Sequence, residues 1–343
     1  MPIQQLIEQG AFLNLSRTSP EYFEQASLFW ISDHTEVTIW APGIIQFEPK
    51  SPTKSIVYSC GIHGNETAPI EICDAMVRDI LTSKLRVQHR VLFLFGNLPA
   101  MDIAERFVEE NMNRLFSGAH AQGGVDNAER QRAKLLEELV EQFFTKNNLP
   151  RFHYDLHTAI RASKNEKFAV YPYLHGKKWN RSQIEFLQAC GVNTFLLSGS
   201  PTTTFSYFSS HQFGAHAFTV ELGKVKPFGQ NDMSRFAAAD RCLRRLICEI
   251  TPNFASDVDE TALLYKINQV INKTHPDFKL HFSDDIPNFT DFAKGTVLAS
   301  ESGNEYCTEQ DGEAIVFPNA DVALGQRALL TVIPVDPVQL DME

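Results

Sequence analysis

Two hydrophobic patterns alternate along the chain up to about residue 250. Continuous apolar runs rich in β-branched residues, typical of buried strands, occupy residues 55–60, 90–97, 152–157, 168–171 and 217–223. Apolar residues at intervals of three and four positions, the pattern of an amphipathic helix, cover residues 68–77, 128–144, 182–189 and 234–250. Strands that alternate with helices predict an α/β fold, in which a largely parallel or mixed sheet is flanked by helices.

The pattern changes on both sides of this region. Residues 28–31 and 37–43 are rich in strand formers, so we expect an entry segment of short strands before about residue 50. After Thr251 and Pro252, short β-like runs separated by turns dominate, at residues 295–299, 314–318 and 328–334. We therefore predict a larger α/β domain over residues 1–250 and a smaller β-rich domain over residues 251–343.

Composition and charge narrow the classes of function. With 43% hydrophobic and 21% charged residues, the chain is typical of a soluble globular protein. A net charge of -11 and the lack of a Lys/Arg-rich tract argue against broad nucleic-acid binding. There is no apolar run of membrane-spanning length and no signal-peptide pattern at the N-terminus.

The six cysteines form no Cys-x-x-Cys pair and lie mostly in apolar segments, as buried, reduced thiols do. We therefore expect a cytoplasmic protein that acts on a small molecule. The sequence leaves open whether it is a monomer or a homo-oligomer.

Candidate chemistry begins where the first long strand pattern ends. The segment Gly-Ile-His-Gly-Asn-Glu-Thr at residues 61–67 follows the predicted strand and precedes a predicted helix. His63 and Glu66 therefore lie at the carboxyl end of a strand, where open α/β sheets place their ligand crevices. An imidazole and a carboxylate three residues apart can face one cation. Alternatively, Glu66 could merely favour the helix N-terminus through the helix dipole.

A third ligand is available in Asp155-Leu156-His157. The period of two along a strand puts Asp155 and His157 on the same face. Two histidines and one glutamate with an open fourth position form the zinc arrangement of catalytic sites. Alone, His157 could be an ordinary hydrogen-bonded histidine at a strand end, but the joint placement of the three residues favours a metal site.

Glu221 lies near the end of the predicted strand 217–223, inside an apolar run. An ionised carboxylate there is costly unless it is paired or used. Burial would raise its pKa toward the working pH, which suits a general base that takes a proton from water. The alternative is a structural carboxylate paired with Lys224 or Lys226.

Two arginines complete the set of candidate residues. Arg106 and Arg114 lie in residues 104–116, a polar stretch of mixed period that we predict to be a loop. A guanidinium beside a metal would stabilise an oxyanion, and another would clamp a carboxylate. Solvation at the surface is the ordinary alternative for each of them.

Taken together, these motifs resemble the succinylglutamate desuccinylase/aspartoacylase family, which is related to the zinc carboxypeptidases. The resemblance extends over about residues 55–225, and the β-rich tail also looks like the family's C-terminal domain. It implies a carboxypeptidase-like mixed sheet flanked by helices and one zinc ion per subunit. The implied ligands are His63, Glu66 and His157.

The resemblance also assigns roles to the other candidates. Val220-Glu221-Leu222-Gly223 matches the segment of the family's catalytic glutamate, and Arg106 stands where the family has its oxyanion-stabilising arginine. Asn113 and Arg114 match the Asn-Arg pair that holds a carboxylate of the substrate. These matches favour function over surface solvation for both arginines.

Within the family, the length and the tail motifs at residues 292–296 and 315–319 look most like the bacterial desuccinylase branch. This implies a zinc-dependent amide hydrolase that cleaves N-succinyl-L-glutamate to succinate and L-glutamate, the last step of arginine catabolism by the succinyltransferase route. Aspartoacylases carry a further substrate arginine shortly before the catalytic glutamate, and His211 takes that position here. Tyr207 and Tyr306 are further candidates for contact with the substrate.

Two alternatives stay open at this stage. The nearer one is the same chemistry on another N-acyl amino acid, such as acetylaspartate, or on a peptide C-terminus. The more distant one is a non-catalytic protein that binds a metal or an anion on the same fold, because fold alone does not determine function.

Overall fold

The computed structural model describes residues 2–255 and 258–343, so residue 1 and residues 256–257 of the two predicted domains lie outside it. One 13-stranded mixed sheet runs through the described part. Its strand order is β1 (Ser27–Trp30), β2 (Thr35–Ala41), β3 (Ile44–Pro49), β5 (Arg90–Phe95), β4 (Ser55–Cys60), β6 (Arg151–Ala159), β9 (His216–Lys224), β7 (Phe168–Tyr171), β8 (Thr194–Leu197), β10 (Leu263–Asn272), β16 (Arg327–Val335), β15 (Glu313–Val316) and β12 (Thr290–Phe292).

The centre of this sheet is parallel. β4 pairs in parallel with both β5 and β6, and β6 pairs in parallel with β9. The direction reverses between β9 and β7, which makes the sheet mixed. The parallel strands β4, β6 and β9 end at one edge, so residues from three distant segments of the chain meet there.

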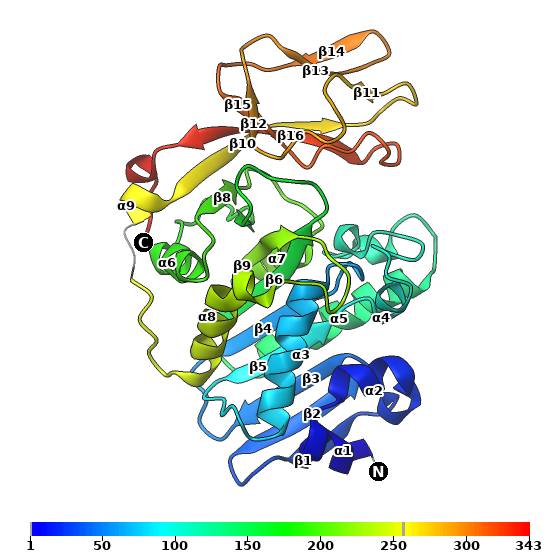
Figure 1. The fold of residues 1–343 in the computed structure, drawn as a ribbon, viewed down its shortest axis with the longest axis vertical. Coiled ribbons are helices and arrows are strands. Elements are labelled where there is room, and N and C mark those ends of the chain that lie inside the picture. The colour runs from blue at the N-terminus through cyan, green and yellow to red at the C-terminus, as the bar shows by residue number, and fades with distance from the viewer. Residues whose placement is uncertain (1, 256–257) are drawn as a thin grey trace.

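Helices cover both faces of the sheet (Figure 1). Buried residues of α1 (Pro2–Gln9), α2 (Phe12–Thr18), α3 (Thr67–Leu81), α6 (Arg181–Ala189) and α8 (Ala237–Cys248) share one apolar cluster with Tyr58 of β4. Those of α5 (Ala128–Thr145) and α7 (Phe205–Phe213) share another with Val57, the residue before Tyr58. Because adjacent residues of a strand point to opposite faces, the two clusters lie on opposite sides of the sheet. The predicted α/β fold is confirmed.

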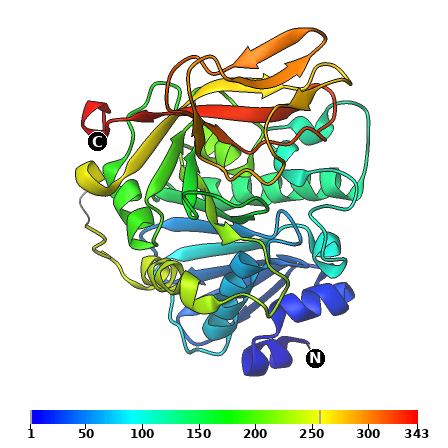
Figure 2. The ribbon, with the colours of Figure 1, turned by 45° about the horizontal axis from the view of Figure 1, so that its top comes forward.

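The C-terminal region is β-rich, as predicted, and it continues the same sheet. β10 pairs in parallel with β8, so there is no gap between the two regions at this point. A second sheet of three strands, β11 (Lys279–Leu280), β13 (Val297–Glu301) and β14 (Asn304–Cys307), packs on this end of the molecule, far from the N-terminal helices (Figure 2). An apolar cluster with Leu298 and Leu329 lies between the two sheets.

Several elements differ from the sequence prediction. The helices α1 and α2 precede the predicted entry strands, and β8, β10 and α7 were not predicted. The sequence of α7, with aromatic residues and serines, has no amphipathic period because both of its sides are covered and positions 205–210 are all buried. None of the described helices has the length and apolar character needed to cross a membrane.

Candidate active site

A tight turn between β4 and α3 carries His63 and Glu66. Gly61 has a φ of +63°, and a Cβ on Gly64 would lie 2.2 Å from the carbonyl carbon of Ala100. Only glycine therefore lets this turn press against the segment that follows β5. Glu66 is the N-cap residue of α3, and both His63 and Glu66 are buried.

His157 reaches the same place from β6. The ligand atoms of His63, Glu66 and His157 all lie within 4.8 Å of one another. The Nδ1 of His63 is 2.8 Å from Glu66 Oε1, and the Nδ1 of His157 is 2.8 Å from Glu66 Oε2. The three predicted ligands thus form one buried group that could bind a metal ion.

The hydrogen-bond partners of the two Nε2 atoms show whether this group fits a metal ion. The Nε2 of His63 lies 2.9 Å from Asn111 Oδ1, and that of His157 lies 2.9 Å from Asp155 Oδ2. With Nε2 donating its proton to these oxygens, each Nδ1 presents a lone pair toward the Glu66 carboxylate. The His63 Nδ1 is buried without a hydrogen bond. Lone pairs and a carboxylate that face one another repel, and a divalent cation between them would turn this repulsion into attraction. The residues therefore fit zinc.

The pKa values of the two histidines shift in opposite directions. Burial lowers the pKa of His63 to about 4, which keeps this imidazole neutral and free to bind a cation. Burial alone would also lower the pKa of His157, but Asp155 and Glu66 together raise it well above its ordinary value. In the absence of a metal, a proton on His157 neutralises part of this negative charge.

Glu221 lies beside His157, because the two residues are direct neighbours across the parallel pair β6–β9. Its side chain is buried, and its Oε2 has no hydrogen-bond partner in the described part of the chain. Burial, and next the negative charge of Glu66, raises the pKa of Glu221 to about 7. Lys224 is exposed, and no ion pair among the described residues joins Glu221 to Lys224 or Lys226.

The arginines approach from the long loop, whose predicted irregular structure is interrupted only by a 3-10 turn at Met112–Arg114. Arg106 Nη1 lies 2.8 Å from Glu66 Oε1. Arg114 Nη1 donates to the carbonyl oxygen of Asn113 at 2.9 Å, and Asn113 Oδ1 accepts from the backbone of Phe205. Burial, and then the charge of Arg106, lowers the pKa of Arg114 to about 10.

A cavity of about 450 Å³ joins these groups, and we call it the site cavity. Its lining includes His63, Arg106, Asn113, Arg114, His157 and Glu221. The C-terminal region also contributes to the lining, through Ile267 of β10 and Arg327 and Leu330 of β16. A site that holds a buried metal-binding group, an unpartnered carboxylate and several guanidinium groups suits hydrolysis of an anionic substrate.

Three other predicted contacts lie outside this lining. Tyr207 and His211 are on α7, where their rings stack 5.3 Å apart and the Tyr207 hydroxyl lies 3.0 Å from His175 Nε2. Tyr306 on β14 donates to Glu301 Oε1 at 2.7 Å. The structure thus groups these three side chains with other partners, and their contact with substrate stays a prediction.

The structure adds residues that sequence reasoning missed. Asp155 Oδ1 accepts from Ser59 Oγ at 2.5 Å, and Ser59 in turn lies 2.8 Å from His153 Nε2, which extends the support of His157 deep into the sheet. The shared face of Asp155 and His157 was a usable signal for this contact. Nothing local in the sequence marked Asn111 or Arg327.

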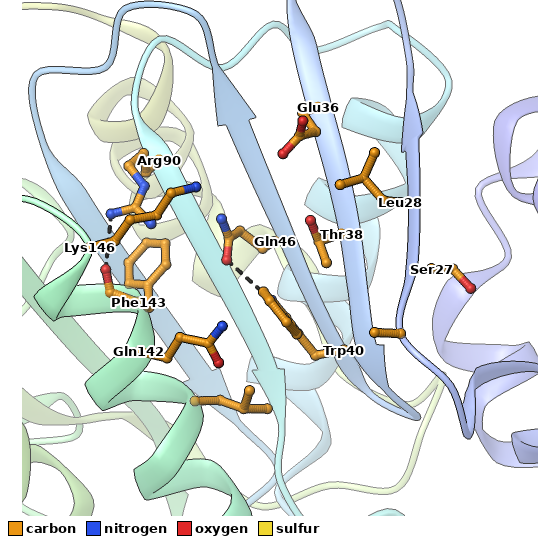
Figure 3. A pocket seen from close by; sticks show the side chains of 12 residues that line it. Ser27, Leu28, Glu36, Thr38, Trp40, Gln46, Arg90, Gln142, Phe143 and Lys146 are labelled. Carbon is orange, nitrogen blue, oxygen red and sulfur yellow. Dashed lines mark hydrogen bonds between the residues drawn. The ribbon is translucent and has the colours of Figure 1, made fainter.

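A second cavity, of about 330 Å³, lies between α5 and the first three strands (Figure 3). Three of its polar side chains contact the adjacent Glu48, whose Oε2 lies 2.7 Å from Gln46 Nε2, 3.1 Å from Arg90 Nε and 3.0 Å from Lys146 Nζ. The Trp40 indole donates to Gln46 at 3.2 Å. This cavity contains none of the predicted site residues.

Comparison with known proteins agrees with the fold. Residues 52–247 match the succinylglutamate desuccinylase/aspartoacylase catalytic domain, and residues 260–335 match the AstE/AspA barrel-sandwich hybrid domain. The chain belongs to the succinylglutamate desuccinylase/aspartoacylase family.

Similar members of this family carry a more particular name. A succinylglutamate desuccinylase of Pseudoalteromonas atlantica is 63% identical over 97% of this chain and 96% of its own length. One of Idiomarina loihiensis is 53% identical over 91% and 92% of the two chains. The solved succinylglutamate desuccinylase of Chromobacterium violaceum has a TM-score of 0.84 at 38% identity, covering 94% and 97%. That of Vibrio cholerae has a TM-score of 0.86 at 35% identity, covering 94% of each.

Proposed function

We propose that this protein is a zinc-dependent amide hydrolase that cleaves N-succinyl-L-glutamate to succinate and L-glutamate. The observation that carries the proposal is the unpartnered carboxylate of Glu221 beside the buried His63–Glu66–His157 group, in a cavity that also contains arginines. The name shared by relatives at 63% and 53% identity supports the choice of substrate.

In the proposed mechanism, His63, Glu66 and His157 hold one zinc ion. When bound, zinc supplies a Lewis acid that polarises the scissile carbonyl and makes water more acidic. Glu221 takes a proton from the attacking water as the carbon–oxygen bond forms. It then passes that proton to the amine nitrogen as the carbon–nitrogen bond breaks. A carboxylate with a pKa of about 7 can do both near neutral pH.

In the proposed mechanism, the two arginines stabilise negative charges of the substrate. Arg106, which contacts Glu66 at the edge of the buried group, stabilises the negative charge that develops on the carbonyl oxygen. Arg114 holds a carboxylate of the substrate through charge-assisted hydrogen bonds, and Asn113 assists from the same 3-10 turn. We further propose that the reaction occurs in the cytoplasm, as the last step of arginine breakdown through succinylated intermediates.

The test measures amine release by the purified, zinc-loaded protein from N-succinylglutamate and N-acetylaspartate, each with and without a chelator. We expect rapid release from the succinyl compound alone, abolished by the chelator and restored by added zinc. Preference for acetylaspartate would keep the mechanism and refute the substrate. Zinc binding without turnover of either compound would favour the non-catalytic alternative.

A further inference from the structure

Arg327 at the start of β16 brings a positive charge into the site cavity from the C-terminal region. Its side chain lines the cavity, and its guanidinium carbon lies 5.3 Å from the centre of the Phe317 ring. Its Nε is buried and has no hydrogen-bond partner in the described part of the chain. The buried Nε thus loses hydration that no hydrogen bond among the described residues replaces.

The charges around Arg327 leave this group without a counterion. Arg106 is paired with Glu66, but no ion pair of the described residues includes Arg114 or Arg327. Burial, followed by repulsion from Arg114, lowers the pKa of Arg327 to about 9. Among the described residues of the lining, only Glu221 carries a carboxyl group, and the proposed mechanism uses it as a base. Two cationic side chains in one cavity are stabilised when an anionic ligand enters.

The proposed substrate has more carboxylates than Arg114 alone can bind. N-succinylglutamate carries one at the far end of the acyl group and two on glutamate. The remaining lining of the site cavity consists largely of neutral groups, such as Ser198, Thr203 and Leu330. Arg327 is thus the cation in the lining that has neither a carboxylate partner nor an assigned role.

We propose that Arg327 binds a second carboxylate of the substrate, other than the one held by Arg114. The C-terminal region would then determine which acyl amino acids are accepted, rather than only covering the cavity. This inference rests on the proposed function. The second carboxylate is one that differs among acyl amino acids, either that of the acyl group or that of the glutamate side chain, and not the α-carboxylate that they all share; the choice of ligands distinguishes the two.

The test uses the Glu221→Gln variant, so that intact substrates can be titrated calorimetrically without turnover. Zinc-loaded E221Q and E221Q/R327M are titrated with N-succinylglutamate, N-acetylglutamate and N-succinylnorvaline. The last two compounds lack the acyl carboxylate and the side-chain carboxylate, respectively. Loss of one charge-assisted contact should weaken binding of N-succinylglutamate by about 10- to 100-fold. The compound that lacks the carboxylate bound by Arg327 should be unaffected.

The control is E221Q/K279M, which removes an exposed cation of the same region on β11 and should leave all three affinities unchanged. E221Q/R327K should retain part of the affinity for N-succinylglutamate that E221Q/R327M loses. Unchanged binding in E221Q/R327M, or an equal loss for all three compounds, would overturn the inference. Absence of N-succinylglutamate hydrolysis by the wild-type protein would refute the proposed function instead, and the binding titrations would still report on Arg327.

Discussion

At the scale of single residues, the pKa values of two neighbouring buried carboxyl groups shift in opposite directions. Burial alone would raise the pKa of Glu66, but the charges and hydrogen bonds of His63 and His157 hold it well below its usual range. Glu221 lacks such partners, and its pKa rises to about 7. One carboxylate is thereby suited to hold a cation and the other to exchange a proton.

The first prediction concerns Glu221. Glu221→Gln should lower kcat/KM by about 100- to 10,000-fold, because the amide cannot accept the proton of the attacking water. Zinc content should stay the same, since Glu221 is not among the three grouped ligands. Steady-state kinetics and metal analysis of the same preparation check both outcomes. The exposed Glu305→Gln serves as control; turnover near the wild-type value in E221Q would remove Glu221 from the mechanism.

The second prediction concerns Asp155, whose Oδ2 lies 2.9 Å from His157 Nε2. Asp155→Asn should weaken zinc binding by about 10- to 100-fold, because the carboxylate orients the imidazole and increases its basicity. Competition with a coloured chelator measures the affinity, with Asp126→Asn on the exposed surface as the matched control. Equal affinities in D155N and wild type would show that His157 needs no such support.

At the scale of elements, the turn after β4 shows why the motif at residues 61–67 needs a fixed spacing between His63 and Glu66. Within the six residues between Cys60 and Thr67, the turn must redirect the chain, place Glu66 as the N-cap of α3 and keep His63 beside it. The backbone N–H of Gly64 also donates to the carbonyl oxygen of Arg106 at 3.1 Å. The turn and the arginine loop therefore hold each other in position.

The third prediction follows from this close contact. Gly64→Ala should lower the free energy of unfolding by about 1–3 kcal/mol and weaken zinc binding, because the added methyl group overlaps the backbone of Ala100. Thermal unfolding with and without zinc measures both effects. Gly199→Ala is the control, since a Cβ there meets nothing within 4 Å. Wild-type stability of G64A would mean that the turn has room to move.

The fourth prediction concerns pH and the half-buried Asp74 of α3. Burial raises its pKa from 3.8 to about 6, although Arg78 partly opposes the shift. A carboxyl with a raised folded-state pKa destabilises the protein as pH rises from 3.8 through 6, because the unfolded chain loses its proton first. Asp74→Asn should therefore stabilise the protein by about 2 kcal/mol at pH 8, allowing for partial solvent access.

Urea unfolding at pH 8 and pH 5 measures this effect. The gain in D74N should fall to about half at pH 5, where the folded carboxyl is largely protonated. The exposed Asp321→Asn should change stability little at either pH. A gain that is the same at both pH values would show that ionisation of Asp74 is not its cause.

At the scale of the whole molecule, the sheet and the site cavity both cross from the α/β region into the C-terminal region. β8 pairs with β10, and Phe168 and Leu196 pack in one apolar cluster with Phe289 and Leu330. The net charge of -11 does not oppose an anionic substrate, because the arginines of the cavity act locally. Our division at residue 250 stays a prediction about folding units.

The fifth prediction tests that division. A chain truncated after residue 250 should aggregate or stay partly unfolded, because it exposes the edge of β8 and the apolar side chains of Phe168 and Leu196. Size-exclusion chromatography and circular dichroism provide the measurement, with the full chain as reference. A monodisperse, folded product with the wild-type KM would instead make the C-terminal region a separable cover.

The sequence by itself determined the structural elements and motifs that depend only on residues close together in the chain. Local periodicity located α3, α5, β4, β6 and β9, because a strand or helix shows its buried face in its own spacing. The motifs around His63 and His157 were recognisable because both lie at the ends of such strands. The short strand β8 and the fully covered helix α7 were missed, since neither has a period of its own.

Tertiary structure decided which side chains from distant segments of the chain meet in the site. The position of β9 next to β6 makes Glu221 a neighbour of His157, and local spacing contains no information about strand order. The same holds for Arg327, which enters the site cavity only because β16 packs beside β10. The sequence thus identified groups able to bind a metal and move a proton, whereas long-range packing determined which of them share one cavity.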